Sequence, residues 1–184
     1  MRLSTPRLRL PVRDLTIFSI LGAMMFLSKI VTQPIPANAH FLGLFIAAFT
    51  LTYRVRALIP LYVYIMLEGV FWGFSPWWIP YLYIFLPLWL MFMLAGKFKI
   101  PIKAQIPLYM SLCGLHGLFF GILYAPAQAL LFGLSFEGMV AWIIAGIPAD
   151  ITHAITNTAA GTLIVPLSLL LKRLDNAPRT QYTP

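Results

Sequence analysis

Ionisable side chains interrupt the long apolar stretches of this sequence, and they are the residues that could carry chemistry. They are Lys29, His40, Glu68, His116, Asp150 and His153. An ionisable residue inside a bilayer costs about 2.5–3.5 kcal/mol on insertion scales, so each one needs a partner, water or a function. Acids and histidines at one depth could bind a polar ligand, relay protons or contribute to a metal site.

Three of the polar residues share one helical face. Asp150, His153 and Asn157 are spaced i, i+3, i+7, which aligns them along a helix. The alternative for Asp150 is structural, because Pro148 just before it and an acid in the first turn are both ordinary helix-start signals. Asp150 and His153 offer two metal ligands, which are too few for a metal site, and we expect no cofactor.

Lys29 and Glu68 also have two interpretations. Glu68 stands alone in an apolar run, so it needs a partner or water. Lys29 lies near the end of its expected helix and could extend to the membrane interface along its own stem. The two residues could instead pair with each other and join two helices. For His116, a packed and hydrogen-bonded histidine is the alternative to a ligand contact.

Aromatic residues crowd the sequence just after Glu68. They are Trp72, Trp77, Trp78, Tyr81 and Tyr83. Tryptophan and tyrosine favour membrane interfaces, which would explain most of them. The same rings could form an aromatic wall for a planar ligand.

The composition identifies the elements that must position these residues. Of 184 residues, 60% are hydrophobic and 10% are charged, with a mean hydropathy of +0.86. Soluble domains are about 45–50% apolar and about 25% charged, so a soluble globule and a disordered chain are both excluded. We expect an all-α polytopic membrane protein. Its single cysteine, Cys113, excludes an intrachain disulfide.

Six transmembrane helices are expected in one membrane domain covering residues 1–184. They span about residues 15–33, 38–53, 57–74, 79–96, 106–131 and 146–171. The short apolar segment 136–145 is expected to be interfacial or re-entrant, and the tail 175–184 to be flexible. Most of the polar groups then fall within two turns of the extracytoplasmic helix ends, which predicts a polar cavity open to the outside.

The distribution of charge predicts the orientation. The net charge is +8, and 12 of the 13 basic residues precede the first helix or follow the second, fourth and sixth. Cytoplasmic loops carry an excess of lysine and arginine, so we expect both termini on the cytoplasmic side of the cell membrane. The positive charge is therefore attributed to orientation in the lipid bilayer, and no nucleic-acid partner is expected.

Several short segments add a family resemblance. They are Pro36–His40, Glu68–Phe74, Trp77–Tyr83, and Gly146–His153 with Asn157. With the length and topology, they make the chain similar, over about residues 12–174, to the substrate-binding S component of energy-coupling factor (ECF) transporters. That family is the vitamin-uptake branch of the ABC transporters. Its A-x-x-x-A motif in the first helix reads Ser19-x-x-x-Ala23 here, with the spacing kept and the first alanine changed.

The resemblance implies a binding subunit without catalysis. Such a subunit holds its vitamin in an outward cavity beneath the loop joining the first two helices. It topples in the membrane when it docks on a transmembrane T component that works with two ABC ATPase subunits. Ser19 and Ala23 would meet the T component. The loop 32–39, with Pro34 and Pro36, would act as the lid.

The resemblance also implies a set of ligand contacts. They are Asn38, His40, Glu68, Trp72, Trp77, Tyr81, Asp150, His153 and Asn157. Candidate substrates are cobalamin or its precursor, pantothenate and a queuosine precursor. One alternative is a self-sufficient ion-coupled carrier that uses Glu68, Asp150 and His153 as a relay. A third hypothesis is an intramembrane enzyme that uses Asp150 and His153.

Overall fold

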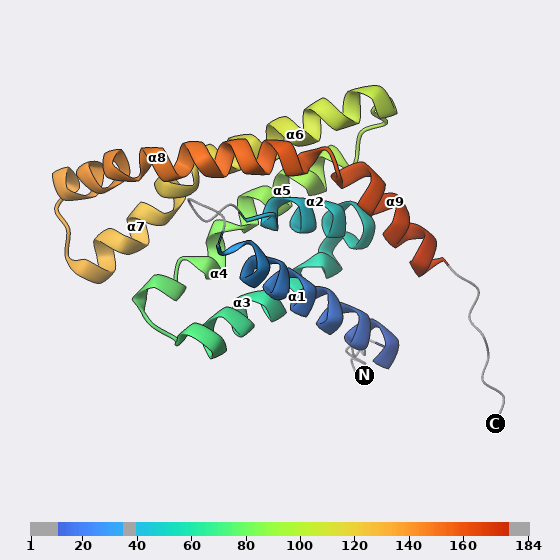
Figure 1. Ribbon diagram of the computed structural model, residues 1–184, viewed down its shortest axis with the longest axis horizontal. Coiled ribbons are helices and arrows are strands. Elements are labelled where there is room, and N and C mark those ends of the chain that lie inside the picture. Colours follow the sequence, from blue (N-terminus) through green and yellow to red (C-terminus); the bar gives the residue numbers. More distant parts are fainter. Residues whose placement is uncertain (1–10, 35–39, 177–184) are drawn as a thin grey trace, which may run out of the picture.

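The computed structural model describes residues 11–34 and 40–176, and within these ranges the chain is helical with no strand. Figure 1 shows the helices as an elongated bundle. The helices are α1 (Val12–Thr32), α2 (Leu42–Tyr53), α3 (Leu58–Trp72), α4 (Tyr81–Ile84), α5 (Leu86–Ala95), α6 (Ile102–Leu118), α7 (Phe120–Phe132), α8 (Phe136–Gly161) and α9 (Ile164–Asp175). Short 3₁₀ turns at Arg54–Ala57 and Pro76–Trp78 precede α3 and α4.

Within the residues that the structure describes, five helical stretches are long and apolar enough to cross a membrane. One of them, Leu42–Trp72, contains both α2 and α3, and it reverses direction at Arg54, whose φ of 58° breaks the helix. Counting α2 and α3 separately gives six. The all-α class expected from the sequence is confirmed, and the apolar helices are compatible with a membrane protein.

The interior of the bundle is filled by large apolar side chains from α1, α2, α3 and α5. Phe18, Met25, Phe49, Tyr64 and Phe92 are almost completely buried. The long helix α8 instead exposes a row of apolar side chains. They are Ile144, Ile147, Ile151 and Ile155. Such an outer surface suits lipid and not water.

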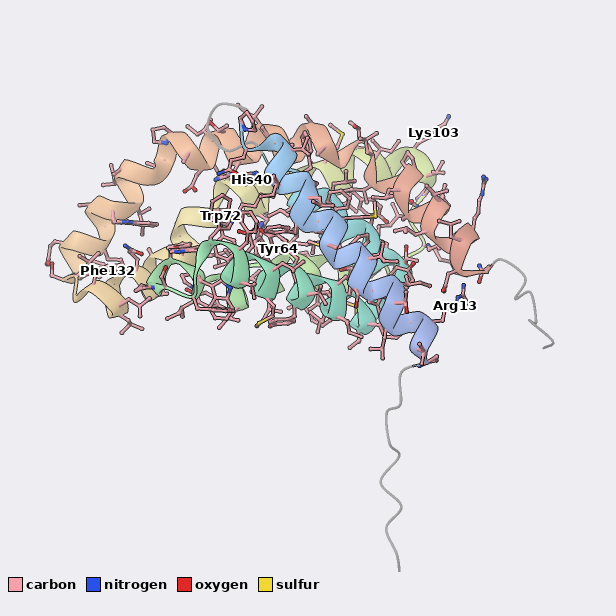
Figure 2. The ribbon with its side chains drawn as sticks, turned by 60° about the horizontal axis from the view of Figure 1, so that its bottom comes forward. Arg13, His40, Tyr64, Trp72, Lys103 and Phe132 are labelled. Atoms are coloured by element: carbon pink, nitrogen blue, oxygen red, sulfur yellow. The ribbon has the colours of Figure 1, made fainter. Side chains whose placement is uncertain are left out.

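The two ends of the bundle differ in chemistry. Figure 2 shows Arg13 and Lys103 at one end and Phe132 at the other. At the basic end the Arg13 guanidinium donates to the Leu174 carbonyl at 3.5 Å, which brings the start of α1 beside the end of α9. Arg56 pairs with Asp14 at 2.8 Å at the same end of α1.

Several helix bounds differ from those predicted. The second helix begins at Leu42 and not at residue 38, and the span predicted over 79–96 is divided into α4 and α5 at Phe85. Residues 106–131 lie within α6 and α7, which meet at Phe119. The predicted tail 175–184 falls mostly outside the described residues.

The largest correction concerns the end of the chain. Residues 136–145 are not a separate interfacial segment, because α8 runs without interruption from Phe136 to Gly161. Its true start is Ser135, whose hydroxyl accepts a hydrogen bond from the Gly138 amide, while Gly133 ends α7 in a left-handed conformation. Pro148 therefore lies inside the helix, where it removes one backbone hydrogen bond without ending it.

Candidate functional site

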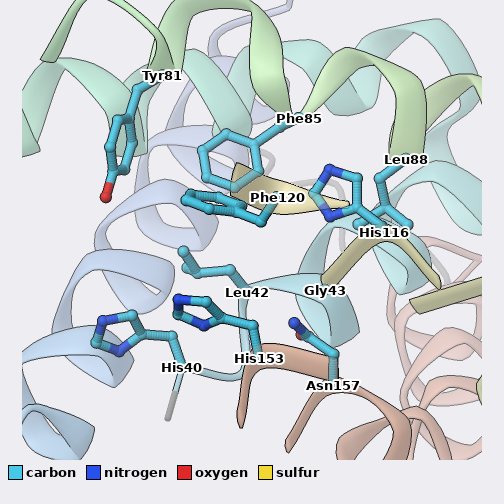
Figure 3. A pocket seen from close by; sticks show the side chains of 10 residues that line it. All are labelled: His40, Leu42, Gly43, Tyr81, Phe85, Leu88, His116, Phe120, His153 and Asn157. Atoms are coloured by element: carbon cyan, nitrogen blue, oxygen red, sulfur yellow. The ribbon is translucent and has the colours of Figure 1, made fainter. Parts of the chain in front are cut away.

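Two adjoining hollows, which share His40 and Tyr81, form the candidate site. We call the more enclosed one the inner chamber; its volume is about 110 Å³, and Figure 3 shows the residues that line it. They are His40, Leu42, Gly43, Tyr81, Phe85, Leu88, His116, Phe120, His153 and Asn157. The outer chamber has a volume of about 380 Å³. Its lining residues are Lys29, Gln33, His40, Trp72, Trp77 and Tyr81.

Helices distant in sequence bring these residues together. Asn157 and His153 lie one turn apart on α8, and Gly43 lies in the first turn of α2. The other walls come from α4 and the chain beside it, α5, α6 and α7. In Figure 3, His40, His153 and Asn157 lie along one side of the chamber, with Tyr81 and Phe85 on the other.

The polar edge of the inner chamber has unused hydrogen-bonding capacity. Asn157 Oδ1 is buried and has no hydrogen-bond partner among the described residues. His116 Nε2 lies 2.8 Å from the Ile84 carbonyl oxygen, and because that oxygen can only accept, Nε2 carries the proton. In a neutral imidazole this leaves the Nδ1 lone pair of His116 available to a donor.

Aromatic rings form the walls of the inner chamber. The rings of Phe85 and His116 stack with centroids 6.3 Å apart, and Phe120 lies 5.2 Å from the ring of His153. Tyr81 meets Phe85 edge to face at 5.5 Å. These rings pack against one another around the cavity, and an aromatic lining of this kind suits a planar ligand.

A buried ion pair lies beside the outer chamber. Lys29 Nζ bonds Glu68 Oε2 and also sits over the Tyr81 ring, 5.4 Å from its centroid. Glu68 is 0% exposed. In the part of the chain that the structure describes, Glu68 Oε1 and the Tyr64 hydroxyl have no hydrogen-bond partner. Of the interpretations open for Lys29 and Glu68, pairing across two helices is the one that the structure shows.

His40 lies between α1 and α2 and lines both chambers. Burial, then the nearby charge of Lys29 and then that of His153, lowers the pKa of His40 from 6.5 to about 4. Its Nδ1 is 3.3 Å from the hydroxyl of Thr32, the last residue of α1. His40 is therefore neutral at physiological pH and offers one donor and one acceptor.

Most of the predicted site residues line the two chambers. They are His40, Trp72, Trp77, Tyr81, His153 and Asn157. Glu68 touches the site through Lys29, and Asn38 lies outside the described residues. Asp150 lines neither chamber as far as the described residues show; its Oδ1 accepts a hydrogen bond from the Gly121 amide at 3.0 Å.

Some lining residues were missed by the sequence analysis. Gly43, Phe85 and Phe120 are indistinguishable by type from the many apolar residues of the other helices. His116 did carry a signal, as an ionisable residue near the middle of a predicted helix. The structure gives it both roles at once, because it bonds a backbone carbonyl and lines the inner chamber.

Comparison with known proteins adds no assignment: no family model matches the chain, and neither a curated protein nor a solved structure matches it.

Proposed function

We propose that this chain is the substrate-binding S component of an ECF-type ABC transporter and that it captures a small, water-soluble, vitamin-like molecule for import. The observation that carries the proposal is the pair of chambers lined by polar and aromatic groups within a bundle of apolar helices. A chamber largely preformed by packed helices is what a binding subunit needs. ATP hydrolysis would belong to two separate ATPase subunits, coupled through a transmembrane T component.

The position of the chambers along the bundle supports capture from outside. Trp72 and His40, which line the outer chamber, lie away from the end that carries Arg13 and Lys103 (Figure 2). If basic residues mark the cytoplasmic side, both termini are cytoplasmic and the outer chamber lies towards the outside of the cell membrane.

The first helix offers a surface for the T component. Ser19 is exposed and Ala23 is half-buried, so small side chains reach the outside of α1. Gly22 faces the other way, against Val63 of α3. Small residues at an exposed helix surface allow a second helix to approach closely.

The carrier alternative gains no support from the arrangement of its proposed relay. Glu68 pairs with Lys29, whereas Asp150 bonds the Gly121 amide at the start of α7. Of the three relay residues, His153 is the one found lining the inner chamber.

The decisive experiment captures partners in intact membranes. The tagged chain is cross-linked in cells of its own host, solubilised gently and analysed by mass spectrometry. We expect a second membrane protein and two ATPases, together with uptake that requires ATP. Ser19→Trp should weaken this assembly, while the matched control Val70→Trp, at an exposed position on α3, should not. Ion-driven uptake by proteoliposomes containing the chain alone would overturn the proposal in favour of a carrier.

A further inference from the structure

The lining of the inner chamber combines apolar and aromatic side chains with polar ones that are uncharged as long as the histidines are neutral. Among the described residues around it, the polar side chains are three histidines, one tyrosine and one asparagine (Figure 3). No aspartate, glutamate, lysine or arginine of the described ranges lines it. A charged ligand group placed there would be desolvated without a permanently charged partner, and a ligand anion would also have to protonate a buried histidine, which is unfavourable.

The outer chamber also offers no unpaired charged side chain among its described lining residues. Its one lysine, Lys29, is already paired with Glu68, which is fully buried. A ligand anion could recruit Lys29 only by leaving the carboxylate of Glu68 buried without its partner. A ligand cation would meet the ammonium group of Lys29, which lines the outer chamber, whereas Glu68 is not among the described lining residues. The pair therefore disfavours either sign of ligand charge.

Two acceptors beside the chamber, unpaired among the described residues, favour a ligand that carries its own hydrogen-bond donors. Asn157 Oδ1 lies at Gly43, where a Cβ atom would come within 2.6 Å of it. This buried oxygen has no protein partner in the described ranges, and buried polar atoms are rarely left unpaired. The Nδ1 lone pair of His116 is a second acceptor on the lining of the same chamber.

We propose that the inner chamber binds a neutral, planar heteroaromatic ring. The ring stacks among Phe85, Phe120 and Tyr81, and its polar edge is recognised by Asn157. The volume of about 110 Å³ is several times the roughly 10–15 Å³ that one water needs, and it suits a small ring system. Any polar group attached to the ring lies in the outer chamber. This inference rests on the proposed function as a binding subunit.

Gly43 provides a structural test of the recognition edge. A Cβ at Gly43 would meet Asn157 Oδ1 at 2.6 Å, so Gly43→Ala displaces the amide that faces the ligand. We expect at least a tenfold loss of affinity. Gly146→Ala on α8 is the matched control, because its added Cβ would have no described atom within 4 Å apart from its chain neighbours and the backbone of its own helix. Asn157→Leu, which keeps the size of the side chain but removes its polar atoms, should weaken binding as much as Gly43→Ala. Thermal unfolding of every variant identifies any that fails to fold.

The first three binding probes share one ring and differ in charge. Binding to the purified chain in lipid nanodiscs is measured by calorimetry for nicotinamide, its anionic acid nicotinate and its cationic N-methyl derivative. Hypoxanthine and lumichrome extend the neutral series to larger rings, and cyclohexanecarboxamide is a neutral probe without a planar ring. We expect one or more neutral heteroaromatic probes to bind at least tenfold more tightly than their charged or non-planar counterparts, and Asn157→Leu to abolish that preference.

Two outcomes would overturn the inference: no binding of any neutral heteroaromatic probe, or equal or tighter binding of a charged probe. These outcomes are separate from failure of the proposed function. If the ATPases are captured but the charged probes bind best, the chain remains an S component with another class of ligand. If neutral rings bind but uptake needs no ATPase, the ligand class stands and the S-component assignment falls.

Discussion

At the scale of single residues, the site depends on polar groups placed where water is scarce. The Lys29–Glu68 pair is the most costly of these, because its carboxylate is 0% exposed. Breaking a buried pair by removing one partner leaves an uncompensated charge, whereas replacing both partners with apolar residues is often tolerated. Single and double variants of the pair can therefore show whether it stabilises the fold or contacts the ligand.

Removal of one member of this pair should destabilise the protein. We expect Glu68→Gln or Lys29→Met to lower the free energy of unfolding by about 3–5 kcal/mol, and the double variant Lys29→Met/Glu68→Leu to recover part of that loss. Equilibrium unfolding in bicelles measures both. Glu68→Gln that leaves stability unchanged but weakens ligand binding tenfold would instead make Glu68 a ligand contact.

His40 predicts a pH dependence with a definite sign. Its pKa is about 4 in the folded protein against 6.5 for the free side chain, because burial and then the charges of Lys29 and His153 disfavour its protonation. As the pH falls from about 6.5 to about 4, the unfolded chain takes up this proton first, so the contribution of His40 to stability is lost over that range. Above pH 6.5 the contribution is fully present.

The measurement is an NMR titration of ¹³C-labelled histidine, with His40→Gln used to assign the signal. The His40 imidazole should remain neutral at pH 5.5, a value that lies between the two pKa values of 4 and 6.5. The melting temperature of His40→Gln should fall less steeply than that of the wild type below pH 6.5. A His40 signal that titrates near its ordinary value would contradict the burial on which this prediction depends.

At the scale of elements, helix ends decide where the polar residues lie. The interruption between α6 and α7 at Phe119 leaves the first amides of α7 without intrahelical partners, and Asp150 of α8 supplies an acceptor to Gly121. A carboxylate at a helix N-terminus also interacts favourably with the helix dipole. Asp150 therefore serves as a cap provided by a neighbouring helix, whereas the sequence suggested either a ligand contact or a structural role at the start of its own helix.

This role gives a prediction that separates Asp150 from the ligand site. Asp150→Leu should lower the free energy of unfolding by about 1–2 kcal/mol through loss of the cap, and should change ligand affinity less than twofold. Asp150→Asn keeps an acceptor oxygen and should cost less. Unfolding in bicelles and calorimetric binding provide the two readouts. A large loss of affinity with unchanged stability would return Asp150 to the binding site.

The same elements show what the sequence can predict. Hydropathy locates the apolar helices because a segment in lipid must carry apolar side chains and pair its backbone polar groups within the helix, and the i, i+4 spacing of His153 and Asn157 places them on one face. The start of α8 was misplaced because Pro148 resembles a helix start, whereas the true cap, Ser135, is a weaker signal. Phe85 and Phe120 were missed because an apolar side chain that lines a cavity cannot be distinguished by residue type from one that faces lipid.

At the scale of the whole molecule, the charged side chains and the hydrogen-bonding chambers lie at different places along the bundle. Arg13 and Lys103 mark the basic end, and the turn between α7 and α8 lies near Phe132 at the other (Figure 2). Uptake from outside requires the outer chamber to face away from the cytoplasm. Orientation in the membrane is therefore the property on which the proposed import depends.

Single-cysteine labelling tests that orientation. Cys113 is the single cysteine of the chain, so Cys113→Ala gives a background without thiols, and thermal unfolding checks that this buried substitution still folds. Into this background are placed Leu134→Cys, in the turn before α8, or Lys103→Cys, in the first turn of α6. A membrane-impermeant maleimide should label Leu134→Cys in intact cells and should reach Lys103→Cys only after permeabilisation, because the basic end lies in the cytoplasm. The opposite pattern would turn the outer chamber towards the cytoplasm, where it could not capture an external solute, and import by this chain would be excluded.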